Sequence, residues 1–235
     1  NNPNASAGPD QQLCTPATGT TLAGRPVTFP ATGTWTVVNG TGTFTDLHSP
    51  TTMVSGLGVG LNTFRWTVSN GLCSSSSDDV AVAVFSAANP VAAAGPDQEL
   101  CAPASATVMA GSAIIFPANG TWSLVSGTGT ITAPNSPTSP VIDLQVGTNV
   151  FVWNVNNGPC ANGMTSDTMV VRVFDPNNPV ASAGSDQQLC TPANTALLAG
   201  SAVISPATGT WTVVQGSGVF SDPHSPTATV GGLAV

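Results

Sequence analysis

Five cysteines are the residues of this chain whose chemistry is easiest to infer from their spacing. Cys14 and Cys73 lie 59 residues apart, and Cys101 and Cys160 have the same separation. No histidine or further cysteine stands at metal-ligand spacing from them, so the pattern favours disulfides over a metal or reactive-thiol site. We therefore predict Cys14–Cys73 and Cys101–Cys160 disulfides, which require an oxidising compartment.

The odd cysteine follows from a sequence repeat. AGPDQQLC begins at Ala7, AGPDQELC at Ala94 and AGSDQQLC at Ala183. A repeat of domain length indicates tandem copies of one folded unit. The partner of Cys190 would fall after Val235, so we expect Cys190 to be unpaired by truncation of the third copy.

Asn-Pro pairs mark the predicted domain boundaries. We expect repeat 1 over 1–88, repeat 2 over 89–177 and a third repeat over 178–235 that lacks its last strands. Proline restricts its own backbone and that of the preceding residue, which predicts stiff joints. We interpret the chain as an internal fragment of a longer one. The third repeat would be completed by its own chain or by a neighbouring subunit. The pairs are Asn2-Pro3, Asn89-Pro90 and Asn178-Pro179.

Apolar residues alternate with polar ones along each repeat. Phe64, Trp66 and Val68 alternate with Arg65 and Thr67, the pattern of a half-buried strand. Glycine-containing turns separate such segments at hairpin spacing. The pattern predicts an all-β fold of tandem Ig-like or PKD-like antiparallel sandwiches, with about seven strands each, arranged as a rod. The predicted core tryptophans are Trp35, Trp66, Trp122, Trp153 and Trp211.

Composition limits the classes of partner. The chain has three basic residues, a formal charge of -8 and a pI of about 4.1. Nucleic-acid binding needs clustered basic residues, so we expect no nucleic-acid partner. No apolar run is long enough to span a bilayer, so we expect no membrane insertion in this segment. The sequence also has no phosphate-binding loop, His/Cys cluster or paired catalytic carboxylates, so we expect no enzymatic activity.

One aspartate recurs in every copy, as Asp10, Asp97 and Asp186. These residues are candidate calcium ligands at the joints between domains, since calcium takes several carboxylate oxygens. The alternative is that each caps a turn by accepting backbone N–H groups, in which case the chain has no metal or other cofactor. Acidic residues that could complete a calcium site are Asp78, Asp79 and Asp167.

The two histidines are weak candidates for catalysis. His48 and His224 each precede Ser-Pro, and the second copy has Asn135 at that position. A residue that asparagine can replace is typical of a turn, so we predict a structural role for both histidines.

The combined motifs carry a resemblance to a known group. AGPDQQLC, GTWTVVNGTGTFTD, NTFRWTVSNGLC and DDVAVAVF resemble the PKD-like and Ig-like repeats of large Bacteroidota surface proteins. This resemblance implies an extracellular or cell-surface location, often with type IX secretion, and a role in adhesion or gliding motility. Asp167-Thr168-Met169 also resembles the Bacteroidota O-glycosylation motif, which makes Thr168 a candidate glycosylation site.

From these features we predict a structural stalk segment of a long extracellular adhesin or surface filament. Its expected partners are neighbouring repeats of the same chain, and also other copies in a filament or surface glycans. Two alternatives remain open: a passive spacer in a secreted multidomain enzyme, and a carbohydrate-binding module.

Overall fold

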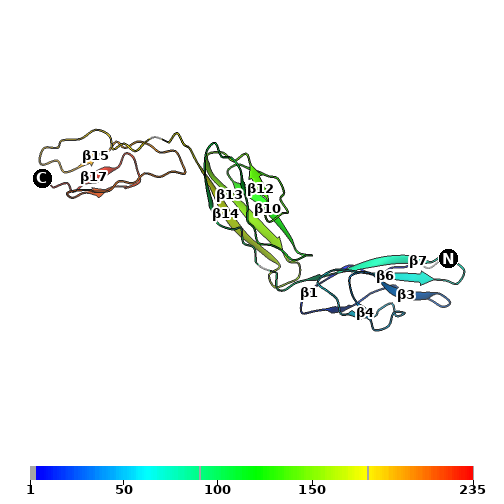
Figure 1. Cartoon of the computed structure of the whole chain (residues 1–235). Coiled ribbons are helices and arrows are strands. Elements are labelled where there is room, and N and C mark those ends of the chain that lie inside the picture. Colours follow the sequence, from blue (N-terminus) through cyan, green and yellow to red (C-terminus); the bar gives the residue numbers. More distant parts are fainter. Residues whose placement is uncertain (1–3, 90, 179, 235) are drawn as a thin grey trace.

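The structure is all-β throughout the part of the chain that it describes. The computed structural model describes residues 4–89, 91–178 and 180–234, and every regular element in them is a strand. Figure 1 shows three units in succession, with the N- and C-termini far apart. The prediction of an all-β fold made mainly of antiparallel sheets is confirmed. Pro3, Pro90 and Pro179 of the predicted joints lie outside the described residues.

The first unit is a sandwich of two sheets built from seven strands. The larger sheet has the order β1 (Gln11–Cys14), β7 (Ser76–Phe85), β6 (Gly60–Ser69), β3 (Thr32–Asn39), and the smaller has the order β2 (Gly19–Thr21), β5 (Met53–Ser55), β4 (Thr43–Phe44). In the larger sheet β1 is parallel to β7, while β7, β6 and β3 pair antiparallel.

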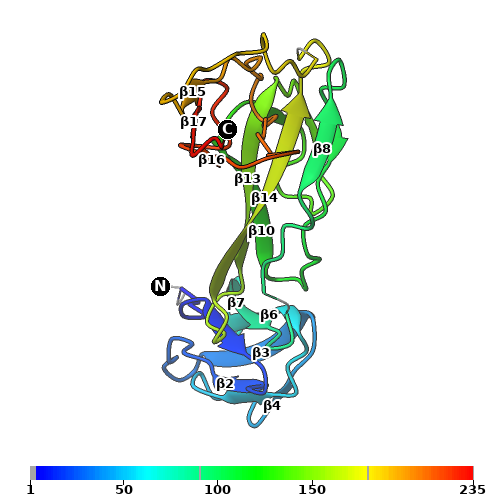
Figure 2. The same ribbon diagram turned by 90° about the vertical axis from the view of Figure 1, so that its left-hand side faces the viewer.

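The second unit repeats this topology, and Figure 2 shows β8 (Gln98–Cys101) beside β14 (Met164–Phe174). These two strands are parallel, as β1 and β7 are in the first unit. Only a three-stranded sheet is found in the described residues 180–234 of the third unit. Unit 2 contains β10 (Asn119–Ser126), β13 (Gly147–Asn156), β14 (Met164–Phe174), β8 (Gln98–Cys101) in one sheet and β11 (Thr130–Ile131), β12 (Pro140–Ile142), β9 (Thr107–Val108) in the other; unit 3 contains β15 (Ala196–Leu197), β17 (Thr229–Gly231) and β16 (Val219–Phe220).

A tryptophan pair lies at the centre of each complete unit. Trp35 of β3 and Trp66 of β6 have ring centroids 5.0 Å apart, and Trp122 and Trp153 repeat the contact at 5.1 Å. All four side chains are buried because period-two alternation points them between the two sheets. Aromatic pairs at such distances add stabilisation beyond area burial.

The third unit keeps one member of this pair. Trp211 stacks on Phe220 with centroids 6.5 Å apart and donates from Nε1 to the Ser225 carbonyl at 2.9 Å. Trp211 is only half-buried and lines an open hollow with Gly200 and His224. The contact that covers Trp35 in the first unit therefore has no counterpart among residues 180–234.

One glycine position, Gly33 in unit 1, shows the difference between the complete units and the third unit. A Cβ added at Gly33 would overlap the ring of Trp66, and one at Gly120 would overlap Trp153. At the equivalent Gly209 the nearest atom is Cγ1 of Val203, at 4.0 Å. We predict that Gly33→Ala destabilises the first unit by about 1–3 kcal/mol through overpacking.

Hydrogen exchange measured as a function of urea concentration would give the free energy of unfolding of each unit separately. Gly209→Ala is the matched control and should change stability by no more than about 0.5 kcal/mol. Equal effects of the two substitutions would contradict the role assigned to the tryptophan ring.

Candidate functional site at the junction between repeats

The direction of β1 places Cys14 at the exit end of the first unit. Because β1 is parallel to β7, Cys14 lies opposite Phe85, the last residue of β7. The Thr15 N–H continues the pairing by donating to the Phe85 carbonyl at 3.0 Å. Cys14 is therefore held where the chain leaves repeat 1 and enters repeat 2.

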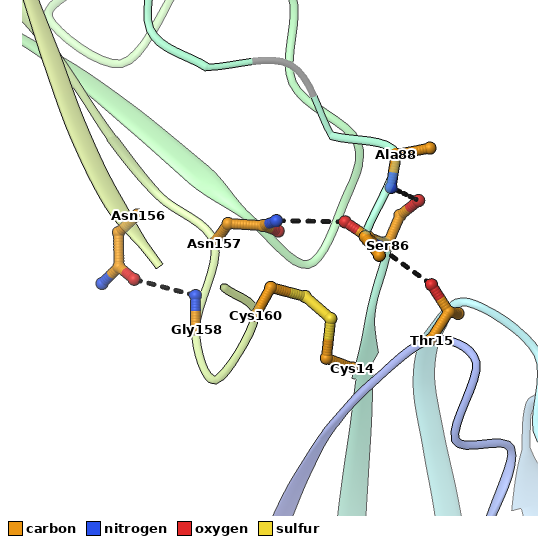
Figure 3. The surroundings of a disulfide bond; sticks show 9 residues. Cys14, Thr15, Ser86, Ala88, Asn156, Asn157, Gly158 and Cys160 are labelled. Carbon is orange, nitrogen blue, oxygen red and sulfur yellow. Dashed lines mark hydrogen bonds between the residues drawn. A yellow bond between two sulfur atoms is a disulfide. The ribbon is translucent and has the colours of Figure 1, made fainter. Parts of the chain in front are cut away.

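A disulfide crosses this junction. Cys14 of the first unit is bonded to Cys160 of the second, with Cα atoms 5.1 Å apart. Cys160 lies in the turn between β13 and β14, in which the Asn157 N–H donates to the Gly163 carbonyl at 2.6 Å. Figure 3 shows this turn reaching the end of the first unit.

Apolar packing surrounds the bridge. Phe85 of unit 1 and Ala118 of unit 2 form a small buried cluster with Cys160, and Cys14 packs against it. Gly158 has φ +55° and lies against the Phe85 ring, so a side chain there would meet the ring as well as backbone strain. The junction therefore has its own small core, separate from the core of either sandwich.

A buried amide adds a polar contact across the same junction. Asn157 is 1% exposed, and its Nδ2 donates to the Ser86 carbonyl at 3.0 Å. Ser86 is the first residue after β7, so the bond joins the turn of unit 2 to the exit of unit 1 (Figure 3). A buried hydrogen bond that fixes two backbone segments gives the joint a defined geometry.

The predicted pairings Cys14–Cys73 and Cys101–Cys160 are therefore corrected. Cys73 precedes β7, whereas Cys14 lies opposite its last residue. Ten residues of strand span about 30 Å, and a disulfide needs Cα atoms within about 7 Å. Cys101 and Cys160 are separated in the same way by β14. The free cysteines of the described residues are Cys73, Cys101 and Cys190, all exposed.

The recurring aspartates have backbone partners in the two complete units. Asp10 accepts from the Ala81 N–H at 2.8 Å, and Asp97 accepts from the Val170 N–H at 3.0 Å. The donating N–H groups lie 71 and 73 residues away along the chain, on β7 and β14, so these bonds are tertiary contacts to the last strand and not the turn cap predicted from the sequence. No group of three or more metal-ligating side chains is found in residues 4–89, 91–178 and 180–234. Asp186 belongs to the third unit, whose described residues include no equivalent of β14.

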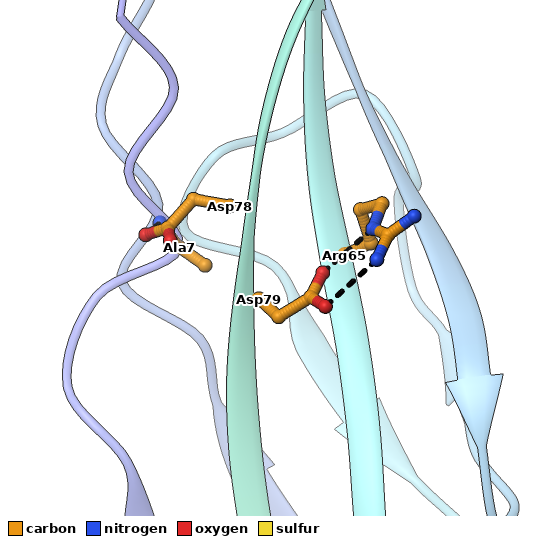
Figure 4. Close-up of polar contacts among 4 residues, drawn as sticks. All are labelled: Ala7, Arg65, Asp78 and Asp79. Atoms are coloured by element: carbon orange, nitrogen blue, oxygen red, sulfur yellow. Dashed lines mark hydrogen bonds and ion pairs between the residues drawn. The ribbon is translucent and has the colours of Figure 1, made fainter.

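A second pair of acids holds the N-terminal segment of each complete repeat. Asp78 accepts from the N–H of the buried Ala7 at 2.8 Å, and Asp167 accepts from Ala94 in the same way. Figure 4 shows Asp78 and Asp79 pointing to opposite sides of β7. The segment before β1 is thereby fixed to the strand that β1 pairs with, which helps to set the position of Cys14.

Asp79 instead forms a surface ion pair. The Arg65 Nε lies 2.7 Å from Asp79 Oδ1, and both side chains are well exposed. Hydrogen bonding, followed by charge attraction, lowers the pKa of Asp79 and raises that of Arg65. Any stability from this pair is present above the usual aspartate pKa and is lost as the pH falls through the lowered value. Exposure to solvent keeps the contribution small.

The histidines contact their own loops. Nδ1 of His48 lies 3.0 Å from the Gly33 carbonyl oxygen, and the backbone N–H of His48 donates to Asp46 Oδ1 at 2.8 Å. His224 makes the equivalent contacts in the third unit. In unit 2 the replacing Asn135 accepts from the Thr121 hydroxyl at 3.2 Å. The arrangement joins a turn to a neighbouring strand in units 1 and 2, and to the equivalent segment at Gly209 in unit 3.

Sequence reasoning missed the residues that surround the bridge. Phe85, Ser86 and Asn157 belong to a strand end and two turns. Phe85 recurs as Phe174 and Asn157 has its counterpart in Asn70, and this recurrence is the signal that could have singled them out.

Thr168 is exposed on β14, where a modifying enzyme could reach it. No helix in the described ranges has the length and apolar character needed to cross a membrane.

Comparison with known proteins gives matches among solved structures. No family model and no curated protein matches the chain. The PKD domain of the KIAA 1837 protein is 29% identical, covering 39% of this chain and 92% of that domain, with a TM-score of 0.32. An I-band fragment of titin is 13% identical over 99% of this chain and 87% of the fragment, with a TM-score of 0.34. A SusE-like surface-located polysaccharide-binding protein of Bacteroides thetaiotaomicron is 10% identical over 74% of this chain and 35% of that protein, with a TM-score of 0.29.

Because the chain has only three basic residues, trypsin digestion gives a direct test of the Cys14–Cys160 disulfide. Trypsin cuts after Arg65 and Arg172, whereas Arg25 precedes Pro26 and resists cleavage. After denaturation and thiol blocking, we predict that fragments 1–65 and 66–172 stay linked in Cys73→Ser and separate in Cys160→Ser. Non-reducing electrophoresis with mass spectrometry would measure this. The opposite pattern would restore the pairing of Cys14 with Cys73.

Neighbouring acids on β7 give a second test. We predict that Asp78→Ala destabilises unit 1 by about 1.5–3 kcal/mol, because it leaves the buried Ala7 N–H without a charged acceptor. Asp79→Ala should cost less than about 1 kcal/mol, because its ion pair is exposed. Denaturant unfolding near neutral pH would compare them. A larger loss for Asp79→Ala would be inconsistent with the assigned roles.

Proposed function

We propose that this chain is a load-bearing stalk segment of a long extracellular or cell-surface protein, with a structural rather than catalytic role. The observation that carries the proposal is the bridged junction: a disulfide, a small apolar core and a buried hydrogen bond join consecutive sandwiches. Domains joined by flexible linkers have none of these contacts. A fixed joint transmits force and direction from one repeat to the next.

The disulfide supports an oxidising location. Such bonds persist in the extracellular space and in the periplasm, where thiol-reducing systems do not remove them. Cys14 and Cys160 enclose a sequence separation of 146, and closing a loop of that size is worth about 5 kcal/mol in the chain-entropy model. Fully extended, that segment would span about 500 Å. While the disulfide is intact, a force applied to the ends of the chain cannot extend this segment. An adhesin or surface filament exposed to shear would use both properties.

Small-angle X-ray scattering of the oxidised chain tests the stalk. We expect Cys73→Ser to leave the distance distribution of the native protein unchanged. Cys160→Ser should broaden it, since the joint then depends on Phe85 and Asn157 alone. A native distribution typical of freely jointed units, or no effect of Cys160→Ser, would contradict a stiff segment.

The spacer and carbohydrate-binding alternatives predict different results. A glycan array probed with the oxidised chain should show no selective signal if the segment serves only to extend and carry load. Selective binding would instead indicate a recognition module.

A further inference from the structure

We propose that consecutive repeats are joined by a continuous series of inter-repeat disulfides, in which the first cysteine of each repeat bonds to the turn cysteine of the next. Cys14–Cys160 is one bond of this series. Cys101 is then assigned to the turn cysteine of a complete repeat after it, and Cys73 to the first cysteine of a repeat before it. The inference rests on the proposed function, because it requires an array.

The surroundings of Cys101 match those of Cys14. Cys101 lies opposite Phe174 at the end of the parallel pair β8 and β14, as Cys14 lies opposite Phe85. The Ala102 N–H donates to the Phe174 carbonyl at 2.9 Å, as the Thr15 N–H does to Phe85. Cys101 is therefore held at the exit of repeat 2, exposed and beside an aromatic ring that is only partly covered.

The surroundings of Cys73 match those of Cys160. The Cys73 N–H donates to the Asn70 carbonyl at 3.1 Å, and the Cys160 N–H donates to the Asn157 carbonyl at 3.3 Å. Asn70 thus has the position of the amide that reaches Ser86 across the observed junction. Both halves of the junction are therefore present in repeats 1 and 2, where Cys73 and Cys101 are exposed and carry no disulfide.

The linker to the third unit is docked in the same way as the one before it. Asn89 Oδ1 accepts from the Ile115 N–H at 2.8 Å, and Asn178 Oδ1 accepts from the Ile204 N–H at 2.7 Å. The segments entering units 2 and 3 are therefore fixed to their units by equivalent bonds. A turn cysteine in a complete third repeat would then lie near Cys101.

This series has a mechanical consequence. The loop closed by Cys14–Cys160 and the loop that would begin at Cys101 overlap in sequence, so the stretch between Cys101 and Cys160 lies inside both. Disulfides within each repeat would leave every joint outside a closed loop. Disulfides between repeats place every joint inside one.

Extension at the N-terminus tests the assignment of Cys73. A second copy of residues 1–88 is placed before Asn1 of the full chain, and the oxidised protein is thiol-blocked and digested with trypsin. We expect the first fragment, which carries the added copy of Cys14, to stay linked when the added copy of Cys73 is replaced by serine and to be released when Cys73 itself is replaced. The opposite response, or an unlinked first fragment in the protein with both cysteines, would overturn the proposal.

Extension at the C-terminus tests Cys101 independently. Residues 60–88 are appended after Val235, which supplies a turn cysteine to the third repeat. We expect peptide mapping to find this cysteine bonded to Cys101, and to find the bond retained in Cys190→Ser and lost in Cys101→Ser. A bond to Cys190 would overturn the proposal.

The Cys14–Cys160 peptide reports in both proteins whether repeats 1 and 2 have folded. Scattering from the same proteins separates this proposal from the stalk. A stiff array with bonds inside the repeats would refute only the bridging, whereas bridged but freely bending units would refute the stalk.

Discussion

The parallel pairing of the first strand with the last strand of each repeat is the constraint on which the junction depends. It brings β1 to the edge of the sheet formed by β7, β6 and β3 and carries Cys14 toward the exit of the unit. Had β1 run antiparallel to β7, Cys14 would lie near the turn that holds Cys73. The direction of one short strand therefore decides whether a cysteine reaches its own repeat or the next one.

Several local interactions fix that strand. The Ala7 N–H is held by Asp78 and the Ala81 N–H by Asp10, so carboxylates tie the N-terminal segment and β7 together from both sides. Both acids have counterparts in repeat 2, Asp167 and Asp97, with the same backbone partners. The recurrence of these aspartates is explained by strand placement. Each accepts a backbone N–H group that would otherwise lack a protein partner.

Much of the sandwich was predictable from the sequence. Alternation around Trp66 and Trp153 indicated the long central strands, and the glycine turns indicated the hairpins, because side chains on a strand face a core at every second residue. The repeat also predicted a turn role for His48, since asparagine replaces it in unit 2, and the side chains at both positions contact a neighbouring strand. These features depend on local pattern and on comparison between copies.

The sequence by itself determined the repeated unit, its strand content, its tryptophan core and the presence of cysteines suited to an oxidising environment. Only the tertiary structure decided which cysteines meet. The spacing of Cys14 and Cys73 is the same whether β1 runs up or down the edge of β7, and the alternation of apolar and polar residues does not reveal that direction. Once it is set, a strand about 30 Å long separates the cysteines of one repeat and brings Cys14 to Cys160 in the next.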